Sequence, residues 1–278
     1  MRLCVDMGAG AVVVLGAALG VFSAAPQALR GNIRVLKLSE AKAFQMGNVK
    51  SVRVVSPEIG ARRLTLNYSV SEPSYEFPQH VHDGSDDTFL VLEGEVDVRQ
   101  GQSRRPLRKG EAAFVPAGQV HGTVTTGTGT AILISFQCPP DMALYTGARD
   151  SSRPGAPAPV GTITPGAVKL VNFGARDGLF VHPAMGAIRA AAAHRTLRRG
   201  ESLAIRTTGG QEALLFVWRG AVSVRSPEAT YSAGERDTVF LSAPVSLTVE
   251  SGANEAELIY VESPPGLPDA HSTGPQRR

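Results

Sequence analysis

Residues 78–97, PQHVHDGSDDTFLVLEGEVD, carry the clearest structural signal in the chain. Two of the six histidines in the chain, His80 and His82, stand two positions apart in it. Side chains at i and i+2 of a β-strand point to the same face of a sheet, so we expect the two imidazoles to converge. The apolar run at 89–92 is typical of a buried strand that ends at a Glu-Gly pair.

The same pattern of short strands extends outward from this stretch. The chain has 30 Gly and 19 Pro in 278 residues, and its hydrophobic content is 42%. Apolar or alternating runs bounded by turn residues are typical of strands, and together they predict an all-β protein. The runs are RRLTLNYSV (62–70), TFLVLEGEVDVRQG (88–101), AAFVPAG (112–118), GTVTTG (122–127) and TAILISFQ (130–137).

A second copy of the pattern follows at an offset near 125 residues. Three aligned pairs in the same order indicate an internal duplication of one β unit. The pairs are TFLVLEGEVDVRQ (88–100) with LLFVWRGAVSVRS (214–226), LRKGEAAFVP (107–116) with YSAGERDTVF (231–240), and AILISFQCPP (131–140) with AELIYVESPP (256–265).

The duplication and a Pro/Gly/Ser-rich segment predict the domain organisation. The two units are expected over residues 26–145 and 178–265, joined by a linker over 146–177. Residues 266–278 are expected to form a disordered tail.

The N-terminal residues 1–25, MRLCVDMGAGAVVVLGAALGVFSAA, resemble a secretory signal peptide. One Arg offset by Asp6, and Pro26 after the small residues, argue against cleavage, so an apolar extension stays the alternative. The protein is expected to be secreted or periplasmic in the first case and cytoplasmic in the second. The segment is Gly-rich and barely long enough to span a bilayer, so no permanent membrane span is expected.

The composition limits which partners and which metal ligands we expect. The net charge is +3, and no run of five like charges occurs, so no nucleic-acid partner is expected. Cys4 and Cys138 form no CxxC arrangement, which gives no sign of a thiolate zinc site. A metal site would therefore have to use histidines and carboxylates.

The spacing of these residues resembles the cupin superfamily. The first cupin motif is His-x-His, three or four residues, an acid, six residues and Gly; the chain has His80, His82, Asp87 and Gly94 at those intervals. Asp87 stands where the family usually has Glu, so direct ligation, action through water and a role as base all stay open. Asp86 is expected to face the other way, because neighbouring strand residues alternate.

The second cupin motif is Gly, five residues, Pro-x-Gly, two residues, His, three residues and Asn. Here the matching residues are Gly110, Pro116, Gly118, His121 and Thr125, and Thr125 replaces the frequent Asn. The resemblance implies two antiparallel jelly-roll barrels (double-stranded β-helices) in tandem. It also implies one divalent transition metal held by His80, His82, Asp87 and His121 in the first barrel. Fe, Mn, Ni, Cu, Co and Zn all suit such ligands, and the sequence does not rank them.

The second copy lacks the whole ligand set. Alignment on Gly94 and Gly220 puts four other residues at the ligand positions, so the C-terminal unit is interpreted as a degenerate cupin. These residues are Arg206, Thr208, Ala213 and Val245. His182 and His194 lie outside the motifs and are interpreted as ordinary structural or surface histidines.

The resemblance favours a metal-dependent oxidoreductase of the dioxygenase type, acting on a small planar chelating substrate. The alternatives are a metal-dependent isomerase or lyase, with Asp87 or a water as base, and a non-catalytic small-molecule-binding protein. Phe89 and Val91 share the inward parity and are expected in the pocket wall, with Phe114 and Phe136 as further candidates. Homodimerisation through sheet edges is an open expectation.

Overall fold

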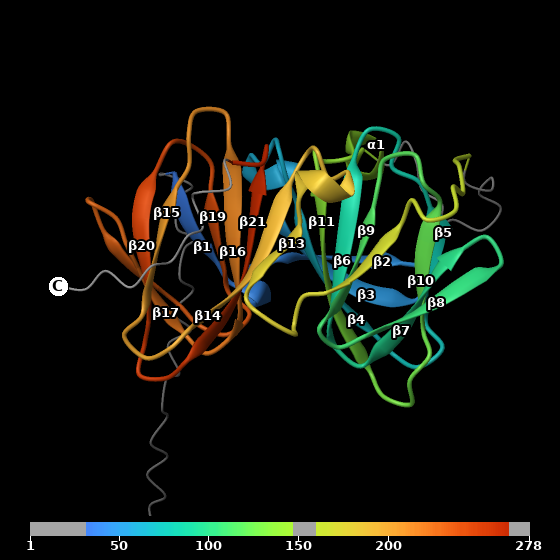
Figure 1. Cartoon of the computed structure of the whole chain (residues 1–278), viewed down its shortest axis with the longest axis horizontal. Helices are drawn as coiled ribbons and strands as arrows, with labels where there is room; N and C mark the ends of the chain where they lie inside the picture. The colour runs from blue at the N-terminus through green and yellow to red at the C-terminus, as the bar shows by residue number, and fades with distance from the viewer. Residues whose placement is uncertain (1–31, 147–159, 267–278) are drawn as a thin grey trace, which may run out of the picture. The chain divides into compact units, whose positions relative to one another are not determined.

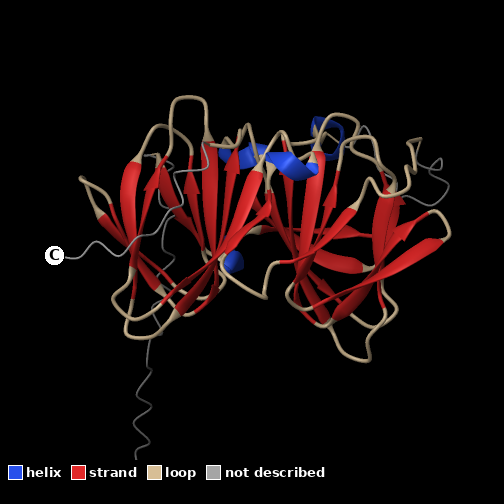
Figure 2. Cartoon of the chain, viewed as in Figure 1, coloured by secondary structure: helices blue, strands red, loops and turns tan. Residues whose placement is uncertain are grey.

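Antiparallel β-sheets build the part of the chain that the computed structural model describes, residues 32–146 and 160–266 (Figures 1 and 2). The predicted all-β fold with two tandem barrels is confirmed. No helix among the described residues is both long and apolar enough to cross a membrane. The predicted signal peptide at 1–25 and most of the predicted tail lie outside these residues.

The first barrel consists of a seven-stranded sheet, β12-β9-β6-β11-β4-β3-β2, and a four-stranded sheet, β5-β10-β7-β8. The larger sheet contains β2 (Lys42–Met46), β3 (Val49–Val55), β4 (Leu66–Ser71), β6 (Asp86–Glu93), β9 (Glu111–Val115), β11 (Ala131–Cys138) and β12 (Lys169–Asn172). The smaller sheet contains β5 (Glu76–His80), β7 (Glu95–Gln100), β8 (Ser103–Arg108) and β10 (His121–Thr125). The short helix α1 (Met142–Tyr145) follows β11, and 3-10 turns lie at Leu38–Glu40 and Pro57–Ile59.

The second barrel consists of a six-stranded sheet, β1-β19-β16-β21-β14-β13, and a four-stranded sheet, β15-β20-β17-β18. The larger sheet contains β1 (Ile33–Leu36), β13 (Gly178–Val181), β14 (Ala191–Leu197), β16 (Glu212–Arg219), β19 (Thr238–Leu241) and β21 (Ala256–Ser263). The smaller sheet contains β15 (Ser202–Arg206), β17 (Val222–Arg225), β18 (Thr230–Ala233) and β20 (Ser246–Ser251). A 3-10 turn lies at Pro183–Met185.

The two barrels repeat one strand order. The central strands run β9-β6-β11-β4-β3 in the first and β19-β16-β21-β14-β13 in the second. The three aligned sequence pairs fall on β6 and β16, β9 and β19, and β11 and β21. β2 has no counterpart in this order, so the first barrel carries one additional edge strand.

The edge strands β1 and β12 are exchanged between the barrels. β1 pairs with β19 of the second barrel, and β12 pairs with β9 of the first. The predicted ranges differ from this pairing, because β1 lies inside 26–145 and β12 inside the predicted linker 146–177. Sequence composition marks where strands begin and end, whereas the sheet that an edge strand joins depends on the pairing partner that folding brings to it.

The main hydrophobic core lies between the two larger sheets. It joins Leu90, Phe114 and Phe136 of the first barrel to Phe216 and Phe240 of the second. A separate apolar cluster fills the interior of each barrel. Every residue of β6 except the last is buried, because one face of this strand packs inside the barrel and the other in the shared core. This double burial explains the continuous apolar run at 89–92.

Gly94 separates β6 from β7 and explains why the motif has glycine there. Its φ is +78°, and a Cβ at this position would lie 2.8 Å from the Thr130 carbonyl oxygen. Gly220, the equivalent residue, has φ +77° and a similar close approach to Glu255. L side chains rarely adopt this backbone conformation, so both turns require glycine.

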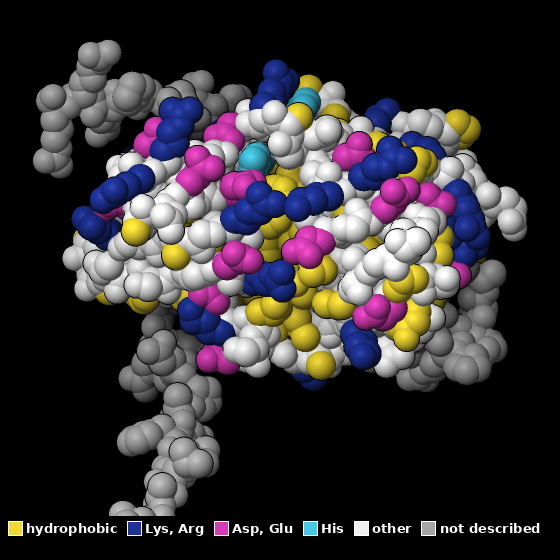
Figure 3. All heavy atoms as spheres, turned by 90° about the horizontal axis from the view of Figure 1, so that it is seen from below, with side chains coloured by type: hydrophobic (Ala, Val, Ile, Leu, Met, Phe, Trp, Pro, Cys, Tyr) yellow, Lys and Arg dark blue, Asp and Glu magenta, His cyan; other side chains and the backbone are white. Residues whose placement is uncertain are grey.

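The surface seen from below shows Lys and Arg interspersed with Asp and Glu around an apolar centre (Figure 3). This face therefore carries no extended field of a single sign.

Candidate metal centre

Four ligand-type side chains meet in the first barrel. His80 ends β5, His82 follows two residues later, Asp87 lies in β6 and His121 begins β10. One potential ligand atom from each residue lies within 4.8 Å of the others, and all four residues are buried. His121 and His80 are paired across β10 and β5, which places one histidine from each motif side by side.

The Nδ1 atom of each imidazole forms a hydrogen bond to a residue outside the cluster. His80 Nδ1 donates to the Pro78 carbonyl (2.8 Å), and His121 Nδ1 donates to the Gln119 carbonyl (3.0 Å). His82 Nδ1 donates to Asp141 Oδ2 (3.0 Å). These bonds fix the tautomers and leave the three Nε2 atoms for the cluster, which is the arrangement of metal-ligating histidines.

Asp87 reaches the same centre. Its Oδ2 lies 3.2 Å from His121 Nε2 and 3.6 Å from His82 Nε2. Its Oδ1 is buried and has no hydrogen-bond partner among the described residues. An uncompensated buried carboxylate oxygen next to three imidazole nitrogens fits a divalent cation, so these residues could hold a metal ion.

Asp86 faces away from this cluster, as the strand alternation predicts. Its Oδ1 accepts the Ala117 backbone N–H (3.0 Å) and a guanidinium N–H of Arg189 (2.8 Å). Arg189 belongs to the second half of the chain. The two adjacent aspartates therefore have different roles: Asp87 serves the cluster, and Asp86 links the barrels.

In the metal-free cluster, burial and hydrogen bonding have opposite effects on the pKa values of His82 and Asp87. Burial favours neutral His82, but the hydrogen bond to Asp141 and the contact with Asp87 outweigh it and raise the pKa of His82 to about 9. Burial likewise favours protonated Asp87, but bonds from His121 and His82 hold its pKa well below the usual range. For His80, burial and the neighbouring imidazoles lower the pKa. The cluster thus keeps a carboxylate and one proton, and a cation would replace that proton.

Gln137 borders the cluster from β11, directly across from Asp87 in the strand register. Its Nε2 lies 3.2 Å from His82 Nε2, while its buried Oε1 has no hydrogen-bond partner among the described residues. A half-turn of the amide exchanges the two atoms and lets Oε1 accept a hydrogen bond from the Nε2–H of protonated His82. Gln137 is therefore placed to hold His82 in the absence of a metal.

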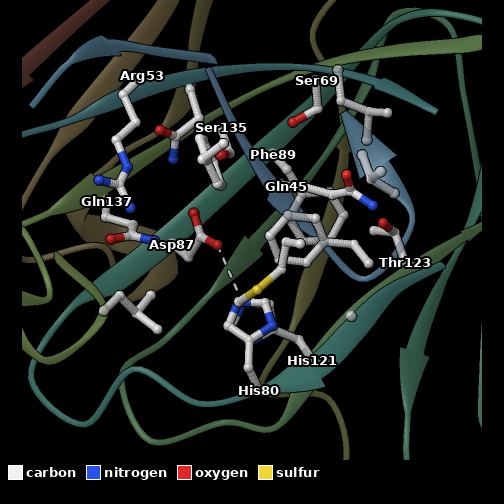
Figure 4. A pocket seen from close by; sticks show the side chains of 18 of the residues that line it. Gln45, Arg53, Ser69, His80, Asp87, Phe89, His121, Thr123, Ser135 and Gln137 are labelled. Atoms are coloured by element: carbon white, nitrogen blue, oxygen red, sulfur yellow. Dashed lines mark hydrogen bonds and ion pairs between the residues drawn. The ribbon is translucent and has the colours of Figure 1, made fainter. Parts of the chain in front are cut away.

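A cavity of about 440 Å³ opens onto the cluster (Figure 4). His80, Asp87 and His121 line it, whereas His82 is not among the lining residues. Phe89 also lines the cavity, with its ring nearly parallel to that of His121 at 6.3 Å between centroids. The other lining residues are Phe44, Gln45, Met46, Val49, Arg53, Asn67, Ser69, Ser71, Phe77, Gly122, Thr123, Leu133, Ser135, Gln137, Leu144, Tyr145 and Thr146.

The structure corrects three of the four expected pocket residues. Both Phe89 and Val91 belong to the apolar cluster inside the barrel, but only Phe89 also lines the cavity. Phe114 and Phe136 lie in the core between the larger sheets. In β9 and β11 these two rings take the outward parity, while Ala113, Ser135 and Gln137 take the inward one.

Four polar residues around the site escaped the sequence analysis. Asp141 orients His82, and Gln137, Asn67 and Arg53 line the cavity. Arg53 and Asn67 share the inward parity of β3 and β4, which was a usable signal once those strands were in register. Asp141 follows two prolines and caps α1, and no local pattern relates it to a histidine 59 positions earlier.

The equivalent positions of the second barrel carry no such cluster. Arg206 and Thr208 are exposed, and Ala213 is buried in the aliphatic cluster that fills the barrel, against which Val245 packs. His194, expected to be an ordinary histidine, is buried against Phe173 and Trp218, with Asp177 and Glu257 at 3.6 and 3.5 Å. The ligand set is thus confined to the first barrel among the described residues.

One protein-family model matches the part of the chain that contains this cluster. Residues 68–136 match the cupin domain model. The matched residues form a cupin domain, which lies in the first barrel. No curated protein matches the sequence.

Solved structures share the fold of most of the chain. The bacterial pirin YhhW from Escherichia coli, solved with nickel(II), has a TM-score of 0.64 and 16% identity; the likeness covers 84% of this chain and 100% of that one. Ylba from Escherichia coli has a TM-score of 0.64 and 14% identity, covering 84% and 91%. Oxalate decarboxylase from Bacillus subtilis has a TM-score of 0.60 and 12% identity, covering 82% and 75%. At these identities the likeness concerns the fold.

Proposed function

We propose that the first barrel binds one divalent transition metal through His80, His82, Asp87 and His121. We further propose that the protein is a metal-dependent oxidoreductase of the dioxygenase type. The observation that carries this proposal is the set of three outward-anchored imidazoles around the unpaired Asp87 oxygen at a cavity. The nickel in the pirin structure supports metal binding by this fold.

The side chains have separable roles in this proposal. His80, His121 and Asp87 line the cavity and would present ligand atoms to it, while His82 would bind from beneath, held by Asp141. A divalent transition metal held by these four residues would supply Lewis-acid or redox chemistry to a chelating substrate in the cavity. The cation would offset the negative charge of Asp87, so His82 would lose its proton and could bind as a neutral imidazole.

The cavity wall supports a planar substrate. Phe77 and Phe89 flank the histidines, and the ring of Phe77 lies 5.2 Å from that of His80. Flat apolar walls beside the cluster would exclude water from a bound ring. They would leave its chelating oxygens directed at the position of the metal. A catechol, enol or keto acid has this shape and chemistry.

The experiment is metal analysis of the purified protein, followed by O2 uptake against a panel of catechols, enols and keto acids. We expect one redox-active metal per chain and O2 consumption with at least one chelator. His82→Ala should abolish both, and His182→Ala, outside the cluster, should abolish neither.

Other outcomes assign another function. Turnover without O2 in a Zn or Mn protein would support the isomerase or lyase alternative, with Asp87 or a water as base. Ligand binding that survives His82→Ala with no turnover would support the non-catalytic alternative.

A further inference from the structure

Arg53 supplies the guanidinium group among the described residues that line the cavity. It comes from β3, outside both cupin motifs. Its guanidinium carbon lies 4.9 Å from the ring centroid of Phe44 and 4.7 Å from that of Tyr145. The side chain is largely buried, with 19% of it exposed. Contact with two aromatic rings holds the planar guanidinium in one orientation, so that its N–H groups have fixed directions.

The charge of Arg53 is weakly compensated. Its ion pair is with Glu58, at 3.6 Å, and Glu58 already accepts a hydrogen bond from Lys42 at 2.7 Å. Glu58 is also 42% exposed, so solvent screens this contact. No hydrogen bond from the Arg53 guanidinium to another described residue is present in the structure, which leaves its donors available to a ligand.

A row of polar side chains leads from Arg53 toward the metal cluster. In the strand register Arg53 is paired with Asn67, Asn67 with Ser135, and Ser135 with Phe89. Asn67 is 8% exposed and lines the cavity, and its buried Oδ1 has no hydrogen-bond partner among the described residues. Figure 4 shows Arg53, Ser135 and Gln137 on the same side of the cavity as Asp87, since all four come from the seven-stranded sheet. This corner is built for a polar ligand group, because an apolar one would leave the amide unpaired.

We propose that Arg53, together with Asn67, binds the carboxylate end of the substrate, which makes the substrate a planar organic acid with a chelating pair of oxygens at its other end. The proposal deepens the proposed function and rests on it for the chelating end. The guanidinium fork matches a carboxylate with two parallel hydrogen bonds, and the partly buried site strengthens them. Arg53 is then the residue that selects acids over neutral chelators of the same shape.

The probes are catechol and 3,4-dihydroxybenzoate, which share a chelating pair and differ in one carboxylate. Their dissociation constants are measured by calorimetry without O2, on the metal-loaded full chain. We expect the wild type to bind the acid at least roughly tenfold more tightly, as a charge-assisted bidentate contact supplies. Arg53→Met should lose this preference while its catechol affinity stays within about threefold. Arg53→Lys should keep part of the preference, and Arg104→Met, on the exposed face of β8, should keep all of it.

Two results would overturn the proposal: equal wild-type affinities for the two probes, or a preference that persists in Arg53→Met. Thermal unfolding of each variant shows that the protein tested is folded. Benzoate has no chelating pair but its carboxylate could ligate a metal, so its binding is measured on the metal-free chain, where it reports on Arg53. Benzoate binding that disappears in Arg53→Met would support the acid site even if metal analysis refuted the proposed function.

Discussion

Asp87 shows how a short side chain reaches the centre of the cluster. The resemblance to cupins left its role open, because the family usually has the longer Glu at this position. In the structure Asp87 Oδ2 is 3.2 Å from His121 Nε2, and Oδ1 is buried without a partner among the described residues. Direct ligation is therefore geometrically accessible, and it forms part of our proposal.

The bond from His82 to Asp141 gives the first prediction. Asp141→Asn removes the charge that orients His82 and favours its Nε2 as a ligand, so we expect metal affinity to fall by roughly 10–100-fold. Competition with a chelator dye measures the affinity. Asp97→Asn, on β7, is the matched control and should leave it unchanged. Equal affinities for Asp141→Asn and the wild type would show that Asp141 does not support the site.

At the scale of single elements, parity decides which aromatic residues face the cavity. β6 directs Phe89 inward, whereas β9 directs Phe114 into the core between the sheets. The structure buries both strands on both faces, and in such strands the apolar pattern of the sequence does not distinguish inside from outside. The pairing register, which the sequence does not state, resolves the difference.

Phe114 gives the second prediction. Phe114→Ala should lower the free energy of unfolding by about 3–5 kcal/mol, because it opens a cavity in the shared core. The milder Phe114→Leu should leave metal stoichiometry and catechol affinity unchanged. Urea unfolding and calorimetry measure these quantities. A change of catechol affinity in Phe114→Leu without a loss of stability would return Phe114 to the pocket.

The turn between β6 and β7 gives the third prediction. Gly94→Ala forces a left-handed backbone and a contact with the Thr130 carbonyl, so we expect a loss of about 1–3 kcal/mol in unfolding free energy. Gly84→Ala is the control, because a Cβ there meets nothing within 4 Å. Similar stability of the two variants in thermal unfolding would contradict this explanation of the motif glycine.

At the scale of the whole molecule, the second barrel is joined to the first by more than a shared core. Arg189 donates to Asp86, next to Asp87. In the opposite direction, Glu212 accepts the backbone N–H groups of Arg62 and Arg63 (2.8–3.1 Å). Asp86 and Glu212 occupy equivalent positions of the repeat, so the duplication placed one buried carboxylate on each side. The barrel without ligands thus helps to position the strand that carries Asp87.

Glu212 gives the fourth prediction. Glu212→Ala leaves two backbone donors of the first barrel without their carboxylate acceptor, and we expect stability to fall by roughly 1–3 kcal/mol. The barrels should still unfold in one calorimetric transition, because β1 and β12 are exchanged and the main core is shared. Glu228→Ala, on an exposed turn, should change neither quantity. Two separate transitions in the wild type would disprove this coupling.

The sequence contains one more pair of repeated segments than the three pairs of strands. SPEIGARR (56–63) and HPAMGAIR (182–189) share the offset of the other repeats, and both form a 3-10 turn capped by a left-handed glycine. These segments carry Arg62, Arg63 and Arg189, the residues that link the barrels. These two segments lack strand periodicity, so an alignment based on apolar runs does not reveal that they are repeated.

Three features could be predicted before the structure was known: the all-β class, the tandem repeat and the convergence of His80, His82, Asp87 and His121. Local periodicity is enough for the first two features, because a strand places alternate residues on one face. The convergence of the four side chains was implied by the resemblance of their spacing to the cupin motifs. Only the tertiary structure decided the strand exchange, the partners that orient the histidines, and the presence of Arg53 and Asn67 in the cavity. Those depend on contacts between residues far apart in the chain, which follow from sheet register and barrel closure rather than from local pattern.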